Sequence, residues 1–236
     1  PASYTNRSEV WKCVVTPNDG TVNGPPAQDE VTIQNTAPVA SSLTITPSSP
    51  KTTDDLIGSY TYYDADSDPQ SGSEIRWYKN DTLQSAYNDL LTIPASATTK
   101  GDVWYFTVKP KDGIAFGALQ TSPTVTVINS PPVASDLAIS PSSPKTTDNL
   151  VGSYTYYDAD SDPQSGSEIR WYKNDTLQSA YNDLLTIPAS ATTKNDVWYF
   201  TVKPKDGIEF GTLQTSPSVT LENSPPVLDP IGPKSV

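Results

Sequence analysis

The sequence contains the same unit twice in direct succession. Residues 38–131 align with residues 132–225 without a gap, and 83 of the 94 aligned positions are identical. Within this alignment, residues 58–100 match residues 152–194 completely. Any fold for this chain must therefore close within a unit of 94 residues, which is long enough to bury one hydrophobic core.

Both ends of the chain are similar to parts of the same unit. The stretch "VWKCVVTPNDG" at residues 10–20 matches "VWYFTVKPKDG" at residues 103–113. The sequence contains no Met, which favours a segment of a longer product. We expect four parts: the end of a preceding domain in 1–36, full repeats in 37–130 and 131–224, and the start of a following domain in 225–236.

Short alternating strands separated by turn residues fill each unit, a pattern typical of an all-β sandwich. In the first repeat the pattern predicts about seven strands, at residues 42–46, 56–63, 74–79, 83–85, 89–93, 103–109 and 123–128. Neighbouring residues of a strand point to opposite faces, so Trp77, Trp104 and Phe106 are expected to face the core. The stretch "PASATTKGD" favours one helical turn.

Three motifs occur in a fixed order in each repeat: "DADSDP", then Trp77 in "RWYKND", then "VWYFTVKPKDG". In this order and spacing the chain resembles the immunoglobulin-like superfamily. It is most similar to the tandem repeats of bacterial and archaeal surface proteins that are related to PKD and cadherin-like domains. The resemblance implies β-sandwiches of about seven strands, arranged end to end, in an extracellular or cell-surface protein.

The resemblance also implies a changed disulfide. In such folds a Trp of the third strand packs on a disulfide between the second and sixth strands. Trp77 fits that Trp, and Cys13 stands at the sixth-strand position, level with Phe106. A partner cysteine would lie near Gly58, so Gly58 and Phe106 replace the cystine in this repeat. Cys13 is then expected to bond to a cysteine outside this segment; the alternative is a free buried thiol.

Aspartates at every second position form the clearest candidate for a metal site. The expected ligands are Asp64, Asp66 and Asp68, joined at the same end of the sandwich by Asp112, and their copies are Asp158, Asp160, Asp162 and Asp206. Close carboxylates repel one another, and calcium prefers six to eight oxygen ligands. The spacing departs from an EF-hand loop, since Pro69 stands at the sixth position. The alternative is a solvated acidic loop whose Asp side chains cap its own turn.

Composition excludes several other functions. The net charge of −12 argues against nucleic-acid binding, which needs clustered Lys and Arg. The chain contains no His, which excludes His-based triads and His metal ligands. No apolar run approaches the 18 residues or so of a membrane span. We therefore expect no catalytic residues in this segment.

Two further groups of residues could contact other molecules. Tyr78 and Tyr105 should point outward from neighbouring strands and form an exposed pair, which Tyr172 and Tyr199 repeat. Such pairs are candidate contacts for glycans or protein partners, although Tyr is also an ordinary outward strand residue. Asn6, Asn80 and Asn174 begin N-x-S/T sequons, and the last two lie in expected turns.

These features favour a structural, non-catalytic segment of an extracellular stalk, adhesin or filament subunit. Its partners would be other copies of the same protein or surface ligands such as glycans. One alternative is a carbohydrate- or protein-binding module that acts through the Tyr pairs. Another is an accessory spacer of a secreted enzyme.

Overall fold

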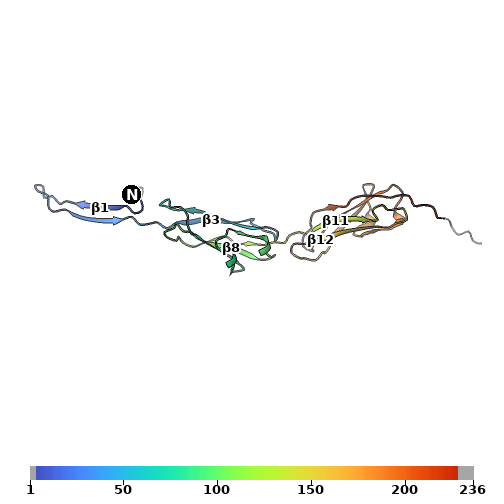
Figure 1. Cartoon of the computed structure of the whole chain (residues 1–236), viewed down its shortest axis with the longest axis horizontal. Helices are drawn as coiled ribbons and strands as arrows, with labels where there is room; N and C mark the ends of the chain where they lie inside the picture. Colours follow the sequence, from blue (N-terminus) through green and yellow to red (C-terminus); the bar gives the residue numbers. More distant parts are fainter. Residues whose placement is uncertain (1–3, 228–236) are drawn as a thin grey trace, which may run out of the picture. The chain divides into compact units, whose positions relative to one another are not determined.

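The computed structural model describes residues 4–227, which fall into two compact units that meet between Ile128 and Asn129. Residues 228–236, most of the expected start of a following domain, lie outside the described residues. In each unit the expected sandwich is present (Figure 1). Among the described residues, no helix is long and apolar enough to cross a membrane.

The first sandwich consists of two antiparallel sheets. One sheet has the order β3-β4-β7, from strands β3 (Val39–Thr46), β4 (Leu56–Tyr63) and β7 (Thr92–Ile93). The other has the order β10-β8-β5-β6, and β9 also pairs with β8; its strands are β5 (Glu74–Lys79), β6 (Thr82–Leu83), β8 (Val103–Lys109), β9 (Gln120–Thr121) and β10 (Val125–Thr126). The third strand thus lies beside the sixth, as in immunoglobulin-like sandwiches.

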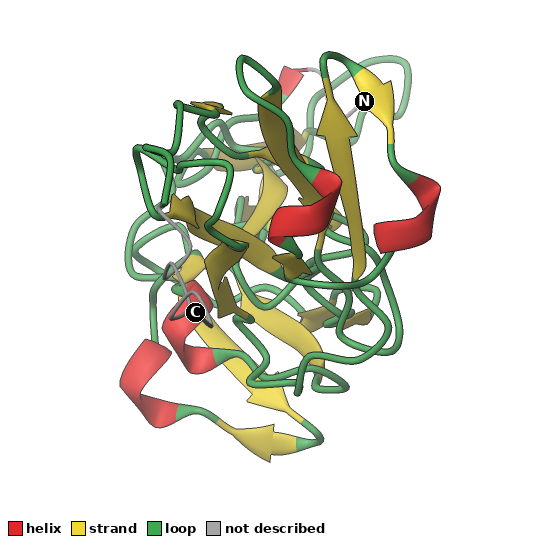
Figure 2. Ribbon diagram, turned by 90° about the vertical axis from the view of Figure 1, so that its right-hand side faces the viewer, coloured by secondary structure: helices red, strands yellow, loops and turns green. Residues whose placement is uncertain are grey.

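The second sandwich repeats this order. Its first sheet is β11-β12-β15, from β11 (Val133–Ser140), β12 (Leu150–Tyr157) and β15 (Thr186–Ile187). The other sheet contains β13 (Glu168–Lys173), β14 (Thr176–Leu177), β16 (Val197–Lys203), β17 (Gln214–Thr215) and β18 (Val219–Thr220). Both sandwiches also contain single 3-10 turns, red in Figure 2, which include η2 (Ser85–Tyr87), η3 (Ala95–Ala97), η4 (Ser179–Tyr181) and η5 (Ala189–Ala191).

Aromatic rings dominate the core of the first sandwich. Trp77, Trp104 and Phe106 are completely buried, as their alternation predicts. The ring of Trp77 lies 5.0 Å from that of Phe106 and 6.3 Å from that of Trp104, measured between centroids. A Cβ atom added to Gly58 would lie 3.0 Å from both the Phe106 and the Trp77 rings. The Phe106 ring therefore fills the space over Gly58, where the resemblance placed a disulfide.

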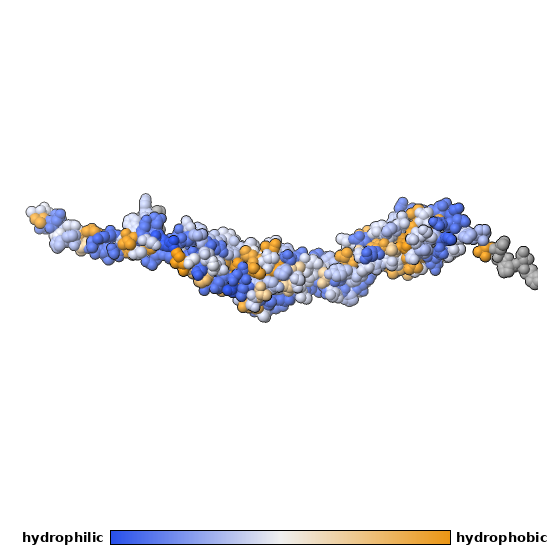
Figure 3. Space-filling model, in the orientation of Figure 1, coloured by the Kyte–Doolittle hydropathy of each residue, from blue (hydrophilic) through white to orange (hydrophobic). Residues whose placement is uncertain are grey.

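The N-terminal residues form a separate hairpin within the first unit. Strands β1 (Val10–Val15) and β2 (Ala27–Thr32) pair antiparallel, and Val10 lies opposite Thr32 as Val103 lies opposite Thr126. Every residue of both strands is exposed, and apolar side chains are visible along this hairpin in Figure 3. Cys13, which lies opposite Asp29, is an exposed free thiol rather than a buried one.

Asp89 fixes the long loop that precedes β7. Its Oδ1 accepts hydrogen bonds from the backbone N of Ile75, at 3.0 Å, and from Nη1 of Arg76, at 2.6 Å. The bond from Ile75, with that from Arg76, lowers the pKa of Asp89 below its ordinary 3.8. Because the folded-state pKa is lowered, this carboxylate stabilises the fold above pH 3.8 and loses that effect as the pH falls toward the lower value.

We therefore expect the difference in unfolding free energy between the native chain and Asp89→Ala to depend on pH. The difference should be largest near neutral pH and should shrink below pH 3.8, where the native carboxylate becomes protonated. Urea unfolding at a series of pH values measures it, and Ser85→Ala, at an exposed position of the same loop, serves as the control. A difference that stays constant from pH 7 to about pH 2 would contradict this role.

Candidate metal centre

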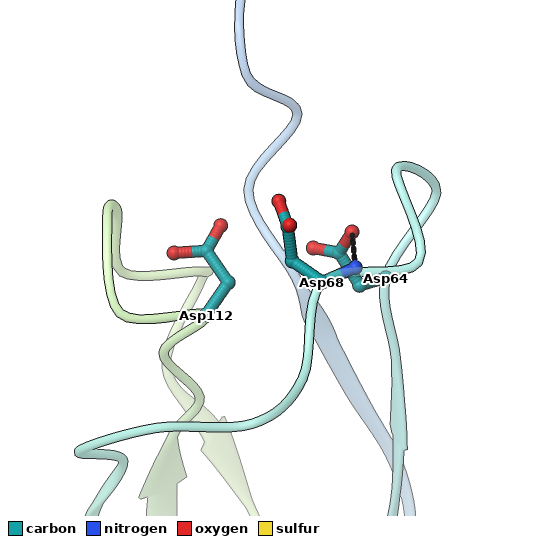
Figure 4. Close-up of side chains that lie close together, drawn as sticks. All are labelled: Asp64, Asp68 and Asp112. Atoms are coloured by element: carbon teal, nitrogen blue, oxygen red, sulfur yellow. Dashed lines mark hydrogen bonds between the residues drawn. The ribbon is translucent and has the colours of Figure 1, made fainter. Parts of the chain in front are cut away.

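Three aspartates meet at one end of each sandwich. In the first, Asp64 and Asp68 come from the loop after β4 and Asp112 from the loop after β8, and each offers a carboxylate oxygen within 4.8 Å of the others. Figure 4 shows Asp112 facing the other two across the gap between the loops. The second sandwich repeats the group with Asp158, Asp162 and Asp206.

Asp64 organises its own loop and still keeps one oxygen free. Its Oδ1 accepts hydrogen bonds from the backbone N of Asp66, at 2.8 Å, and of Asp68, at 3.1 Å. The residue is only 8% exposed, and its Oδ2 has no hydrogen-bond partner among the described residues. Turn capping therefore accounts for Oδ1 but not for Oδ2, which is buried and unsatisfied. Asp158 repeats both features in the second sandwich.

Asp68 keeps one oxygen without a partner among the described residues, whereas both oxygens of Asp112 accept hydrogen bonds. Asp68 Oδ1 pairs with Nη2 of Arg7 at 2.7 Å, whereas its Oδ2 is buried without a partner in the described part of the chain. Asp112 Oδ1 accepts the backbone N–H groups of Ile114 and Ala115 at 2.7 and 2.6 Å. Asp112 Oδ2 accepts a 2.8 Å bond from Nδ2 of Asn35, and this bond lowers the pKa of Asp112 to about 2.

Asp66 lies outside the group of three, although the spacing predicted it as a ligand. Its Oδ2 instead accepts the backbone N–H of Thr36 at 2.6 Å. Asp160 binds the backbone N–H of Ser130 at 2.7 Å in the same way. We call residues 35–38 and 129–132 the incoming segments, because each leads into the first strand of a sandwich. Asp66 and Asp160 therefore hold an incoming segment.

The group is strongly negative. Tyr156, whose hydroxyl donates to the backbone oxygen of Asp162 at 3.2 Å, has its pKa raised to about 12, first by burial and then by the charges of Asp158 and Asp206. Oxygen-only ligands suit hard cations such as calcium rather than the metals that prefer nitrogen or sulfur. A cation here would satisfy the buried Oδ2 of Asp64 and reduce the repulsion between the carboxylates.

The expected tyrosine pairs are present on the outer face of the larger sheet. Tyr78 and Tyr105 lie opposite each other on β5 and β8, and their half-buried rings stack at 4.9 Å with 8° between their planes. Tyr172 and Tyr199 stack in the same way at 5.0 Å. The register therefore brings together each pair that the sequence predicted.

The sequon asparagines are exposed but hydrogen-bonded. Asn80 lies in the β5–β6 turn with a positive φ of 49°; its Oδ1 accepts from the backbone N of Val103 and its Nδ2 donates to Asp102, at 2.9 and 3.1 Å. Asn174 repeats this arrangement. Asn6 donates from Nδ2 to Glu9 at 2.8 Å. Glycan attachment at these positions stays a prediction.

Comparisons with known proteins find similar solved structures but no family. No protein-family model matches the sequence, and a search of curated proteins finds no significant match. The FN1–FN3 domains of chicken CNTN1 are 9% identical, with 92% of this chain and 77% of that chain covered and a TM-score of 0.33. A two-domain fibronectin type III segment of chicken tenascin is also 9% identical, with 77% and 98% covered and a TM-score of 0.34.

A bacterial example is the fibronectin(III)-like modules of CbhA from Clostridium thermocellum. They are 17% identical, with 77% of this chain and 94% of that chain covered and a TM-score of 0.27. Our assignment of an immunoglobulin-like fold rests on the strand order of each sandwich.

Proposed function

We propose that this chain is a structural, non-catalytic segment of an extracellular surface protein, in which near-identical sandwiches act as spacers. The observation that carries the proposal is the path of the chain through each sandwich. In the first, the incoming segment is held by Asp66, beside the start of β3. The chain leaves at the other end of β3, where Ile128 N donates to Pro50 O at 2.7 Å.

A strand of eight residues spans roughly 26 Å, so each repeat carries the chain forward by at least about this distance. The second sandwich has the same path, with Ser130 bound to Asp160 at one end and Glu222 N bound to Pro144 O at 2.7 Å at the other. Hydrogen bonds thus fix the chain on both sides of the Ile128–Asn129 peptide bond. Each repeat therefore carries the contacts that hold its own ends, so further copies can be added to the chain without any new contact site.

Deleting one repeat from the full-length protein tests this function. Removal of residues 38–131 joins Ala37 to Pro132 and keeps a Pro-Val sequence at the start of the remaining sandwich. Because each repeat has its own core, we expect the remaining repeat to keep its melting temperature. The surface projection, measured by electron microscopy, should shorten by about 26 Å or more. An unchanged projection, or failure of the remaining repeat to fold, would contradict the spacer function.

We also propose that the acidic group of each sandwich binds calcium. The support is the buried, unsatisfied Oδ2 of Asp64 and Asp158, which capping of their loops does not explain. The ligands in the first sandwich would be Asp64, Asp68 and Asp112. Calcium would stabilise the end of the sandwich at which the incoming segment binds, which suits an extracellular structural protein.

A second candidate function is partner binding through the stacked tyrosines. The specific observation is the flat, half-buried stack of Tyr78 on Tyr105, which presents aromatic surface on an open sheet face. Aromatic surface of this kind suits a sugar ring or a copy of the same chain. Binding of the segment to immobilised glycans, lost in Tyr105→Ala, would favour this function over a bare spacer.

A further inference from the structure

We propose that Asn35 and Asn129 are metal ligands, which present their side-chain oxygens when calcium binds and so couple the ion to the incoming segments. The inference rests on the calcium site proposed above. Three carboxylates supply at most six oxygens, and two of the six in the first sandwich are committed to backbone N–H groups. Calcium, which takes six to eight oxygens, therefore needs further ligands.

The asparagine is a neutral side chain that the structure places directly on the cluster. Asn35 Nδ2 lies 2.8 Å from Asp112 Oδ2, which is the Asp112 oxygen left over by the turn. Asn129 Nδ2 lies 2.8 Å from Asp206 Oδ2. Figure 4 shows the backbone of the incoming segment running between the two acidic loops, and the bond to Asp112 places the Asn35 side chain at the acidic group.

Rotating the terminal amide by half a turn exchanges its nitrogen and its oxygen without moving the backbone. With no cation, the N–H group is the better neighbour for a carboxylate, because a second oxygen would repel it. With a cation between the carboxylates, the oxygen becomes the better neighbour. In the first sandwich this rotation gives up the bonds from Asn35 Nδ2 to Asp112 Oδ2 and to the backbone oxygen of Thr36, at 2.8 and 3.4 Å. It also gives up a 3.3 Å bond from Arg7 to Asn35 Oδ1, and an oxygen–calcium contact would replace these bonds.

The rest of the incoming segment keeps the asparagine within reach. Thr36 N is bound to Asp66, and Pro38 O lies so close to Gly117 that an added Cβ would be 1.8 Å away. Pro132 and Gly211 repeat this contact in the second sandwich. The segment that carries the asparagine is thus already held in place, so calcium binding would not have to pay a large entropic cost to order it. Calcium affinity and docking of the incoming segment should rise and fall together.

The test compares substitutions that remove or keep the oxygen. Calcium chloride is titrated calorimetrically into the 236-residue chain, stripped with chelator, and into Asn35→Ala/Asn129→Ala and Asn35→Asp/Asn129→Asp. A ligand role predicts roughly ten-fold weaker calcium binding or more for the Ala variant. The Asp variant, which keeps the oxygen and adds charge, should bind at least as tightly as the native chain. Asn80→Ala/Asn174→Ala, at the other end of β8 and β16, is the control and should bind normally.

The outcomes separate this inference from the calcium site itself. If Asp weakens binding as much as Ala does, the asparagine acts only as a hydrogen-bond donor, and the inference is overturned while the calcium site stands. If the native chain binds no calcium, the site fails and the inference fails with it. Should the Ala variant not fold, NMR of the native chain decides: calcium must shift the side-chain amide resonances of Asn35 and Asn129, and unshifted resonances refute ligation.

Discussion

Gly58→Ala should lower the free energy of unfolding of the first sandwich by about 1–3 kcal/mol, the usual cost of overpacking a core. The added Cβ would lie 3.0 Å from the rings of Phe106 and Trp77, which are both completely buried in a close-packed core. Elsewhere in a strand, replacing Gly by Ala normally stabilises by about 0.5–1 kcal/mol. The sign of the change therefore reports the packing over Gly58.

Calorimetric melting measures this effect, with the unchanged second sandwich as an internal reference. In a Phe106→Leu background, which reduces the ring contact, Gly58→Ala should cost less than it does in the native chain. Stabilisation by Gly58→Ala would show that the Phe106 ring does not fill the space over the glycine. An equal cost in both backgrounds would show that Phe106 is not the group that opposes the added methyl.

Calcium should raise the melting temperature of both sandwiches. At a concentration 100 times the dissociation constant, a ligand specific for the folded state adds about 2.7 kcal/mol to the free energy of unfolding. For domains of this size, 1 kcal/mol corresponds to about 4–8 °C, so the shift should be roughly 10–20 °C. Asp64→Asn should abolish the shift in the first sandwich and Asp158→Asn in the second, because each removes charge from a buried, unsatisfied carboxylate.

Scanning calorimetry in calcium and in chelator gives the shift directly. Asp81→Asn/Asp175→Asn serves as the matched control, since these residues lie in the β5–β6 and β13–β14 turns, away from the acidic groups, and carry the same formal charge. The control should keep the full calcium response. Identical melting of the native chain in both buffers would rule out a calcium site in this segment.

Strand alternation predicted the long strands of each repeat better than the short ones. The bounds expected for 56–63, 74–79 and 103–109 are those observed for β4, β5 and β8, because each of these strands alternates buried core residues with more exposed ones. The strand expected at 89–93 shortens to Thr92–Ile93. Asp89 there has a positive φ of 63° and uses its side chain to hold Ile75, a tertiary contact that no local pattern signals.

The candidate site was predictable in part. Asp64, Asp68 and Asp112 are local turn residues, so their spacing and the fold together bring them to one end. Arg7 and Asn35 join them from 61 and 77 positions away in the chain, and only the folded structure shows these contacts. The one available signal was the repetition of an Asn before each Pro-bearing joint, in "QNTAPV" and "INSPPV". Asp66 has ligand spacing, but the backbone of Thr36 occupies it.

Small-angle scattering from the purified segment tests the spacer function most directly. A strand of six to eight residues with its loops makes each sandwich roughly 40 Å long. If the two full repeats follow each other end to end, the maximum dimension should exceed about 80 Å. We expect this result most clearly in buffer that contains calcium. A maximum dimension near 60 Å would mean that the repeats fold back on each other, and it would contradict the spacer function.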